Sequence, residues 1–136
     1  MSDSNSNSTP TTELVICTTC RPLGASRAEP ASGQLLLDAV QVAQLQDDEG
    51  RYAQVAVRAI ECISSCSRAC SVAFQAPGKY TYLFGDLQPD PATAEAVLAC
   101  AALHAASVDG QLLRNERPEQ LRNGILARLP PAVVSA

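Results

Sequence analysis

The chain has 136 residues and a mass of 14.3 kDa, the size of a single domain that can bury a substantial core. Its hydrophobic content of 46% and charged content of 18% exclude a disordered or fibrous protein. A formal net charge of −4 and an aromatic content of 4% argue against a protein that binds nucleic acid. The unusual feature is the presence of six cysteines beside one histidine and one methionine.

Residues 1–12 form a Ser- and Asn-rich segment that we expect to be a disordered tail. The segment lacks a basic start, an apolar run and a cleavage site, so we expect neither a signal peptide nor a transit peptide. No stretch approaches the roughly 18–20 apolar residues that span a bilayer, which argues against a membrane partner. We therefore expect a cytoplasmic protein, and in that reducing compartment cysteines more often bind metals or do redox chemistry than form disulfides.

The first part of the chain predicts a strand, a helix and a second strand. Glu13–Cys17 is a short apolar run of β-forming residues. From Ser32 to about Gln46 apolar residues recur at helical spacing, and Ser32 is the expected N-cap. Tyr52–Ile60 alternates as a half-buried strand does. A strand–helix–strand unit of this kind places its two strands parallel in one sheet.

The next part predicts a hairpin followed by a second helix. Val72–Gln75 and Tyr80–Phe84 flank a Pro77-Gly78 turn, which is typical of two antiparallel strands. Asp90 is an N-cap followed by a proline, and the helical pattern continues to about Ser107. The order β-α-β, cysteine loop, β-hairpin, α predicts an α/β, thioredoxin-like fold, in which helices cover a four-stranded mixed sheet.

We expect residues 13–110 to form this domain and residues 111–136 to form an Arg-rich C-terminal extension. A short helix is predicted over residues 118–127, before two consecutive prolines stop it. The arginines of this extension are expected to lie on a solvated helix face, or alternatively to dock an acidic partner; they are Arg114, Arg117, Arg122 and Arg128.

Five of the six cysteines fall into two groups, each directly after a predicted strand. The groups are Cys17-x2-Cys20 and Cys62-x3-Cys66-x3-Cys70. Because the two strands are parallel neighbours, both groups leave the same edge of the sheet. Residues four apart on a helical turn, such as Cys62 and Cys66, have Cβ atoms about 5–6 Å apart. Four thiolates therefore come together, as an iron–sulfur cluster or an all-cysteine zinc site requires.

The cysteine spacing separates these options only in part. Neither the bacterial nor the plant-type ferredoxin spacing is present. Zinc ribbons usually pair two C-x2-C knuckles, whereas one arm here is C-x3-C. A dithiol oxidoreductase would use Cys17 and Cys20 and would leave the second group unexplained. One centre that uses both groups accounts for more cysteines, and zinc binding and dithiol chemistry remain the alternatives.

Other candidate residues have simpler interpretations. Cys100 lies among alanines in the second helix, where we expect it to pack in the core. His104 lies near the end of that helix, where we expect a capping or partly exposed residue. The sequence shows no nucleophile–base pair, phosphate-binding glycine loop or paired carboxylates, so we expect an electron carrier or metal-binding protein and not a catalyst.

Longer motifs carry a resemblance to known families. The span Leu14 to Pro131 contains Cys-Thr-Thr-Cys-Arg-Pro, Glu-Cys-Ile-Ser-Ser-Cys-Ser-Arg-Ala-Cys, Ala-Pro-Gly-Lys-Tyr and Arg-Leu-Pro-Pro. This combination is similar to a bacterial family of predicted metal-binding proteins. The part from Cys62 to Tyr82 resembles the second half of the thioredoxin-like [2Fe-2S] ferredoxins, in which a C-x3-C loop precedes a hairpin strand, a proline turn and an aromatic strand.

The resemblance implies a [2Fe-2S] cluster, with zinc as the alternative cofactor. Cys62 and Cys66 match the ligand motif directly, and Cys17 and Cys20 are the other pair by their position after the first strand. The ferredoxins space their first pair more widely and carry a proline where Cys70 stands, so Cys70 could replace one of the four. The resemblance further implies a one-electron carrier or redox accessory protein with a redox partner protein, and also a homodimer.

Overall fold

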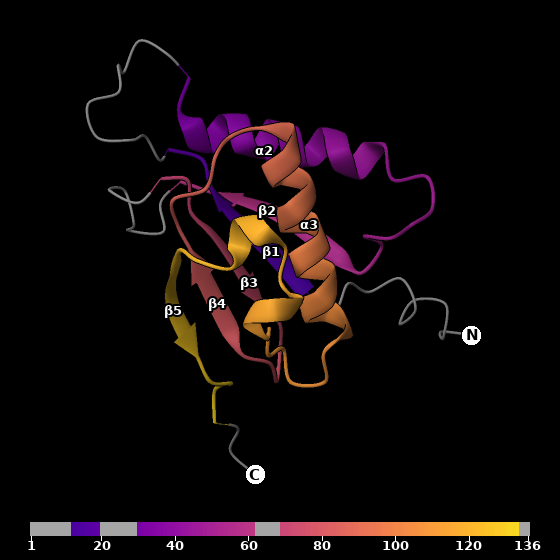
Figure 1. Cartoon of the computed structure of the whole chain (residues 1–136), viewed down its shortest axis with the longest axis vertical. Helices are drawn as coiled ribbons and strands as arrows, with labels where there is room; N and C mark the ends of the chain where they lie inside the picture. Colours follow the sequence, from indigo (N-terminus) through magenta and orange to yellow (C-terminus); the bar gives the residue numbers. More distant parts are fainter. Residues whose placement is uncertain (1–11, 20–29, 62–68, 134–136) are drawn as a thin grey trace.

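The computed structural model describes residues 12–19, 30–61 and 69–133. Five strands form one mixed sheet in the order β2-β1-β3-β4-β5 (Figure 1). The parallel pairing predicted for the first two strands is confirmed, with Cys17 opposite Ile60. The remaining neighbours are antiparallel. The strands are β1 (Thr12–Cys17), β2 (Val55–Ile60), β3 (Val72–Gln75), β4 (Thr81–Phe84) and β5 (Ile125–Leu129).

Helices α2 (Ser32–Leu45) and α3 (Pro91–Ala106) cross on one side of the sheet in Figure 1. Asp90 caps α3 as predicted, because its carboxylate accepts a hydrogen bond of 2.8 Å from the backbone N–H of Thr93. Of the helices that the structure describes, none combines the length and apolarity needed to cross a membrane. Each helix instead presents an apolar side to the sheet.

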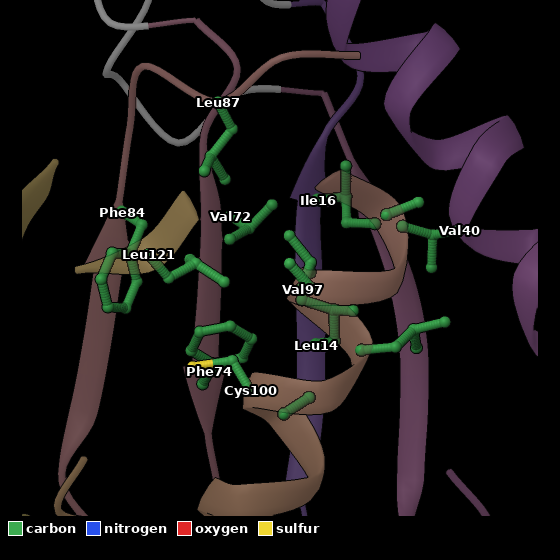
Figure 2. Close-up of a cluster of buried hydrophobic side chains, with 14 of the residues drawn as sticks. Leu14, Ile16, Val40, Val72, Phe74, Phe84, Leu87, Val97, Cys100 and Leu121 are labelled. Atoms are coloured by element: carbon green, nitrogen blue, oxygen red, sulfur yellow. The ribbon is translucent and has the colours of Figure 1, made fainter. Parts of the chain in front are cut away.

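The core lies between this helix layer and the sheet. Figure 2 shows side chains of β1, β3 and β4 meeting those of α2 and α3. The rings of Phe74 and Phe84 pack edge to face with centroids 5.7 Å apart. Cys100 is fully buried among these side chains, so its predicted role in core packing is confirmed.

The start of α2 differs from the prediction. Ser32 was the expected N-cap, but the N-cap is Ala31, and no side chain caps this helix. The first turn is fixed instead by its contact with the end of β1, where Gly33 packs against the backbone of Cys17. A nonlocal contact therefore sets the position of the helix start.

The second strand begins later than predicted, at Val55 and not at Tyr52. The carboxylate of Asp47 accepts backbone hydrogen bonds from Arg51 at 3.0 Å and from Tyr52 at 2.8 Å, which holds a turn before the strand. Tyr52 is nevertheless buried, and its hydroxyl donates to Glu95 of α3 at 2.9 Å. The turn thereby ties β2 to the helix layer.

The C-terminal extension supplies a fifth strand, so the sheet has one strand more than predicted. The helix predicted over residues 118–127 is wrong: the 3-10 turns η2 (Arg114–Glu116) and η3 (Glu119–Leu121) precede β5. Gly124 has a φ of 84°, which turns the chain toward β4. Pairing with β4 then outweighs the helical tendency of the segment, and Leu121 fills the core above the sheet.

His104 is fully buried, so the expectation of a capping or partly exposed residue is wrong. Its Nε2 lies 2.7 Å from the carbonyl oxygen of Tyr80, which can only accept, so Nε2 carries the hydrogen. Its Nδ1 then accepts from the hydroxyl of Thr12 at 2.7 Å. Nearby, Lys79 donates to the carbonyl oxygens of His104 and Ala105 at the end of α3. This network ties α3 to β1 and to the β3–β4 hairpin.

This network predicts a pH-dependent stability. Burial lowers the pKa of His104 from the ordinary 6.5; the hydrogen bond to Tyr80 opposes this shift in part, and the charge of Lys79 adds to it. Because the folded state disfavours protonation, the contribution of His104 is complete above pH 6.5 and is lost as the pH falls through the depressed pKa. Urea unfolding monitored by circular dichroism at pH 7.5 and pH 5 measures this loss.

Two variants provide the comparison. His104→Leu leaves the Thr12 hydroxyl and the Tyr80 carbonyl unpaired and should lower the free energy of unfolding by about 2–4 kcal/mol at pH 7.5. His104→Gln can both donate and accept, so it should cost less. Neither variant should show the wild-type loss between the two pH values, and equal pH dependence in wild type and His104→Gln would contradict the assignment.

Candidate metal centre

Cys17 is the candidate ligand that the structure describes most fully. It lies at the end of β1 and is completely buried. Its backbone N–H donates to the carbonyl of Ser71 at 3.2 Å, and its thiol donates to the carbonyl of Glu61 at 3.6 Å. Glu61 directly precedes the second cysteine group, and Ser71 directly follows it. The chain therefore enters and leaves that group beside Cys17.

Two threonines fix the ends of β1 and β2 against each other. The backbone N–H of Thr18 donates to the carbonyl of Ile60 at 2.9 Å, and its hydroxyl donates to the same oxygen at 3.1 Å. The hydroxyl of Thr19 donates to the carbonyl of Glu61. The residues that follow both strands are thus locked together at the edge of the sheet where the sequence predicts the centre.

The first turn of α2 also lies at this edge. A Cβ atom added to Gly33 would come within 1.9 Å of the carbonyl oxygen of Cys17, so the helix backbone touches the strand. The helix has no side-chain cap and no acidic residue in its first turn. Its N-terminal partial positive charge, about half an elementary charge, is therefore not offset by an acidic side chain of the first turn, and it favours thiolates over thiols nearby.

Cys70 is brought close to Cys17 but lies in a different environment. Its backbone exchanges hydrogen bonds with Leu87 at 3.0 and 3.2 Å, and its side chain belongs to the core cluster with Val72. Burial raises the pKa of Cys70 to about 11, with a further contribution from the nearby Cys17. Without a bound metal, a thiol with this pKa is protonated at neutral pH, and Cys70 packs among the apolar side chains of the core.

Arg117 departs from the expected solvated arginine face. Arg114, Arg122 and Arg128 are exposed, but Arg117 is buried, with its guanidinium 5.6 Å from the ring centre of Phe84. Its Nε and Nη1 have no hydrogen-bond partner among the described residues. Nothing in the local sequence distinguishes this arginine from its neighbours, because its burial follows from the packing of the C-terminal segment onto β4.

Three of the predicted ligands, Cys20, Cys62 and Cys66, lie outside the described residues. Within residues 12–19, 30–61 and 69–133, no group of three or more His, Cys, Asp or Glu side chains is placed to hold a metal ion. The described part contributes Cys17 and the anchors of the second group. A set of soft thiolate donors is the chemistry that both iron–sulfur clusters and structural zinc use.

Because of the contact between α2 and β1, we expect a glycine-to-alanine substitution in α2 to destabilise the protein instead of stabilising it. Alanine is a better helix former than glycine by roughly 0.5–1 kcal/mol, so Gly33→Ala would normally stabilise α2. Here the added Cβ meets the Cys17 carbonyl, and we expect destabilisation by at least about 2 kcal/mol in urea unfolding. Ser32→Ala is the matched control, because Ser32 caps nothing, and it should change stability by less than about 0.5 kcal/mol.

Thiol reactivity tests the burial of the core cysteines. Burial raises the pKa of Cys70 to about 11 and of Cys100 to about 12. Iodoacetamide attacks thiolates, so at pH 8 both residues should stay unmodified in the folded protein and should react after unfolding in urea. Peptide mass spectrometry after short treatment measures each site. Rapid labelling of Cys70 in the folded protein would show that its thiol is accessible and not core packing.

Comparison with solved structures identifies the fold. A thioredoxin-like [2Fe-2S] ferredoxin from Aquifex aeolicus superposes with a TM-score of 0.55 at 12% sequence identity, covering 92% of this chain and 99% of that chain. This similarity confirms the predicted thioredoxin-like α/β fold. Wild-type and cysteine-to-serine structures of the thioredoxin-like [2Fe-2S] ferredoxin from the same organism give TM-scores of 0.41 and 0.39, at 15% and 14% identity. They cover 59% and 57% of this chain, and 76% and 75% of their own.

Comparison of the sequence identifies the family. No curated protein matches the chain. A family model described as protein of unknown function (DUF1636) matches residues 14–131. The motifs that suggested a family resemblance lie within the same span. The chain therefore belongs to this family.

Proposed function

We propose that the protein is a small cytoplasmic redox protein that holds one [2Fe-2S] cluster and exchanges single electrons with a partner protein. The proposed ligands are Cys17, Cys20, Cys62 and Cys66. The observation that carries the proposal is the position of Cys17, whose backbone and thiol contact residues on both sides of the second cysteine group. Similarity of fold to a thioredoxin-like [2Fe-2S] ferredoxin supports it.

The chain's own residues supply the setting for this chemistry. When bound, the cluster would take up and release one electron. Thr18 and Thr19 fix the strand ends from which the proposed ligands extend. The uncapped start of α2 lies beside Cys17, where its partial positive charge would favour thiolate ligands and an added electron. Complete burial of Cys17 keeps its sulfur away from water.

The same burial argues against Cys17 as the attacking thiolate of a dithiol oxidoreductase. In that reading Cys17 and Cys20 would exchange disulfides with a substrate, and an attacking thiolate must be accessible to another sulfur atom. Cys17 is 0% exposed and donates its thiol hydrogen to a backbone carbonyl. A zinc-binding or metal-handling module uses the same four thiolates, and metal analysis distinguishes it from the ferredoxin-like carrier.

Anaerobic purification followed by visible spectroscopy and metal analysis tests the proposal. We expect a brown protein with iron and acid-labile sulfide in equal amounts, because a [2Fe-2S] cluster contains both in that ratio. Cys17→Ala should lose the colour and the iron. Cys70→Ala and Cys100→Ala are matched controls that should keep them, since both thiols pack in the core.

The contrary outcomes are equally specific. A colourless protein with one zinc per chain would replace the ferredoxin-like carrier with a zinc module. Retention of the cluster in Cys17→Ala, or its loss in a folded Cys70→Ala, would show that the proposed ligand set is wrong.

A further inference from the structure

The outward side of α2 is unusually apolar. Leu35, Val42 and Leu45 are 42%, 51% and 84% exposed, whereas the residues that α2 buries face the sheet and α3. The exposed side of a surface helix normally carries charged residues. In α2 the single charged residue is Asp38, and the helix contains no lysine or arginine. Exposed apolar side chains gathered on one element are a feature of interaction sites.

A recess adjoins this apolar side. It has a volume of about 330 Å³ and lies between α2 and the start of α3. Ala39, Val42 and Ala43 form its apolar wall, and Asp38 and Glu95 contribute carboxylates. The surface therefore combines projecting apolar side chains with a hollow large enough to receive a side chain from another molecule.

The charge near the recess is mostly negative. Residues 31–50 contain Asp38, Asp47, Asp48 and Glu49 and no lysine or arginine. Asp47 is paired with Arg51 at 3.2 Å, but Asp38, Asp48 and Glu49 form no ion pair with any described residue. An apolar surface rimmed by unpaired carboxylates is complementary to an apolar patch rimmed by lysine and arginine.

The apolar side begins near the proposed centre. Gly33 touches the backbone of Cys17, and Leu35 follows two residues later, about 3 Å further along the helix axis at roughly 1.5 Å per residue but on the opposite, exposed side of the helix. A protein bound at Leu35 would therefore lie about one helix diameter, roughly 10 Å, from the end of β1.

We propose that this surface binds the redox partner, and we name it the α2 docking face: Leu35, Ala39, Val42 and Leu45 with the rim Asp38, Asp48 and Glu49. The partner that fits is an electron-transfer protein whose apolar contact patch is ringed by basic side chains. That the partner is a redox protein rests on the proposed function. That its contact patch is apolar and basic is inferred from the α2 docking face itself. The rim steers encounter and the apolar centre slows dissociation.

A basic c-type cytochrome, whose haem edge lies in a ring of lysines, is a suitable probe. Its binding to the ¹⁵N-labelled full chain is measured by chemical-shift mapping and by titration calorimetry, at low and high salt. We expect shifts concentrated on α2, an affinity that falls with salt, and about tenfold weaker binding for Asp38→Lys combined with Val42→Ser.

Matched controls carry the same changes elsewhere on the surface. Glu116 is an exposed acid and Leu129 is 57% exposed on β5, so Glu116→Lys combined with Leu129→Ser repeats the charge and polarity change away from α2. The control should bind within about twofold of wild type. Equal weakening in both double variants, or shifts centred away from α2, would overturn the docking face. So would an α2 variant that changes the oligomeric state by light scattering, because the face would then bind a second copy.

Stopped-flow reduction of the cytochrome by the reduced protein separates the two proposals. Binding through α2 without any electron transfer supports the docking face and contradicts the proposed function. Rapid electron transfer that the α2 variant leaves unchanged supports the proposed function and contradicts the docking face. If both proposals hold, the α2 variant should slow the second-order rate by about the same factor as it weakens binding, and the control should not.

Discussion

The end of β1 is the point on which the arrangement of the molecule depends. Cys17 is hydrogen-bonded toward Ser71 on one side and toward Glu61 on the other, and Gly33 packs against its carbonyl. Three segments far apart in the sequence thereby meet around one buried residue. Each contact involves backbone atoms, so the junction tolerates little displacement. Any chemistry of the cysteine groups inherits the rigidity of this junction.

The opposite end of β1 is fixed by different means. Thr12 is hydrogen-bonded to His104 of α3, whose other ring nitrogen donates to Tyr80. Strand β1 is thus held at its start by a side-chain network, and at its end by backbone hydrogen bonds together with those of the Cys17 thiol and the Thr18 and Thr19 hydroxyls. Burial of the imidazole makes the first attachment sensitive to protonation.

Charged side chains are distributed unevenly over the surface of the molecule. The α2 side carries carboxylates that form no ion pair with a described residue, whereas three exposed arginines, Arg114, Arg122 and Arg128, lie in the C-terminal segment around β5. Ionisable groups in the interior are determined by burial and packing. Cys70 and Cys100 remain neutral because burial raises their pKa, and Arg117 packs its cation on the face of Phe84. The net charge of −4 describes neither the surface pattern nor the core.

The sequence by itself determined the elements whose signals are local. Two runs of β-forming residues on either side of a Pro77-Gly78 turn predicted β3 and β4. Asp90 with its following proline predicted the start of α3, and the strand–helix–strand order indicated a parallel β1–β2 pair. The same logic placed two cysteine groups after neighbouring strands, and the contacts of Cys17 on either side of the second group agree with that placement. Hydrophobic periodicity and capping residues depend on neighbours within one or two turns of the chain, so they can be recognised from the sequence alone.

Only the tertiary structure decided the features that depend on distant partners. The segment that ends in β5 has a helical pattern, but the free edge of β4 offers it backbone hydrogen bonds. Ser32 has the character of a cap, but contact with Cys17 sets the helix start. His104 has the position of an exposed helix end, but Thr12 and Tyr80 satisfy it in the core. In each case a nonlocal contact outweighs a local preference, because burial and hydrogen bonding across the fold exceed the fraction of a kcal/mol that propensity supplies.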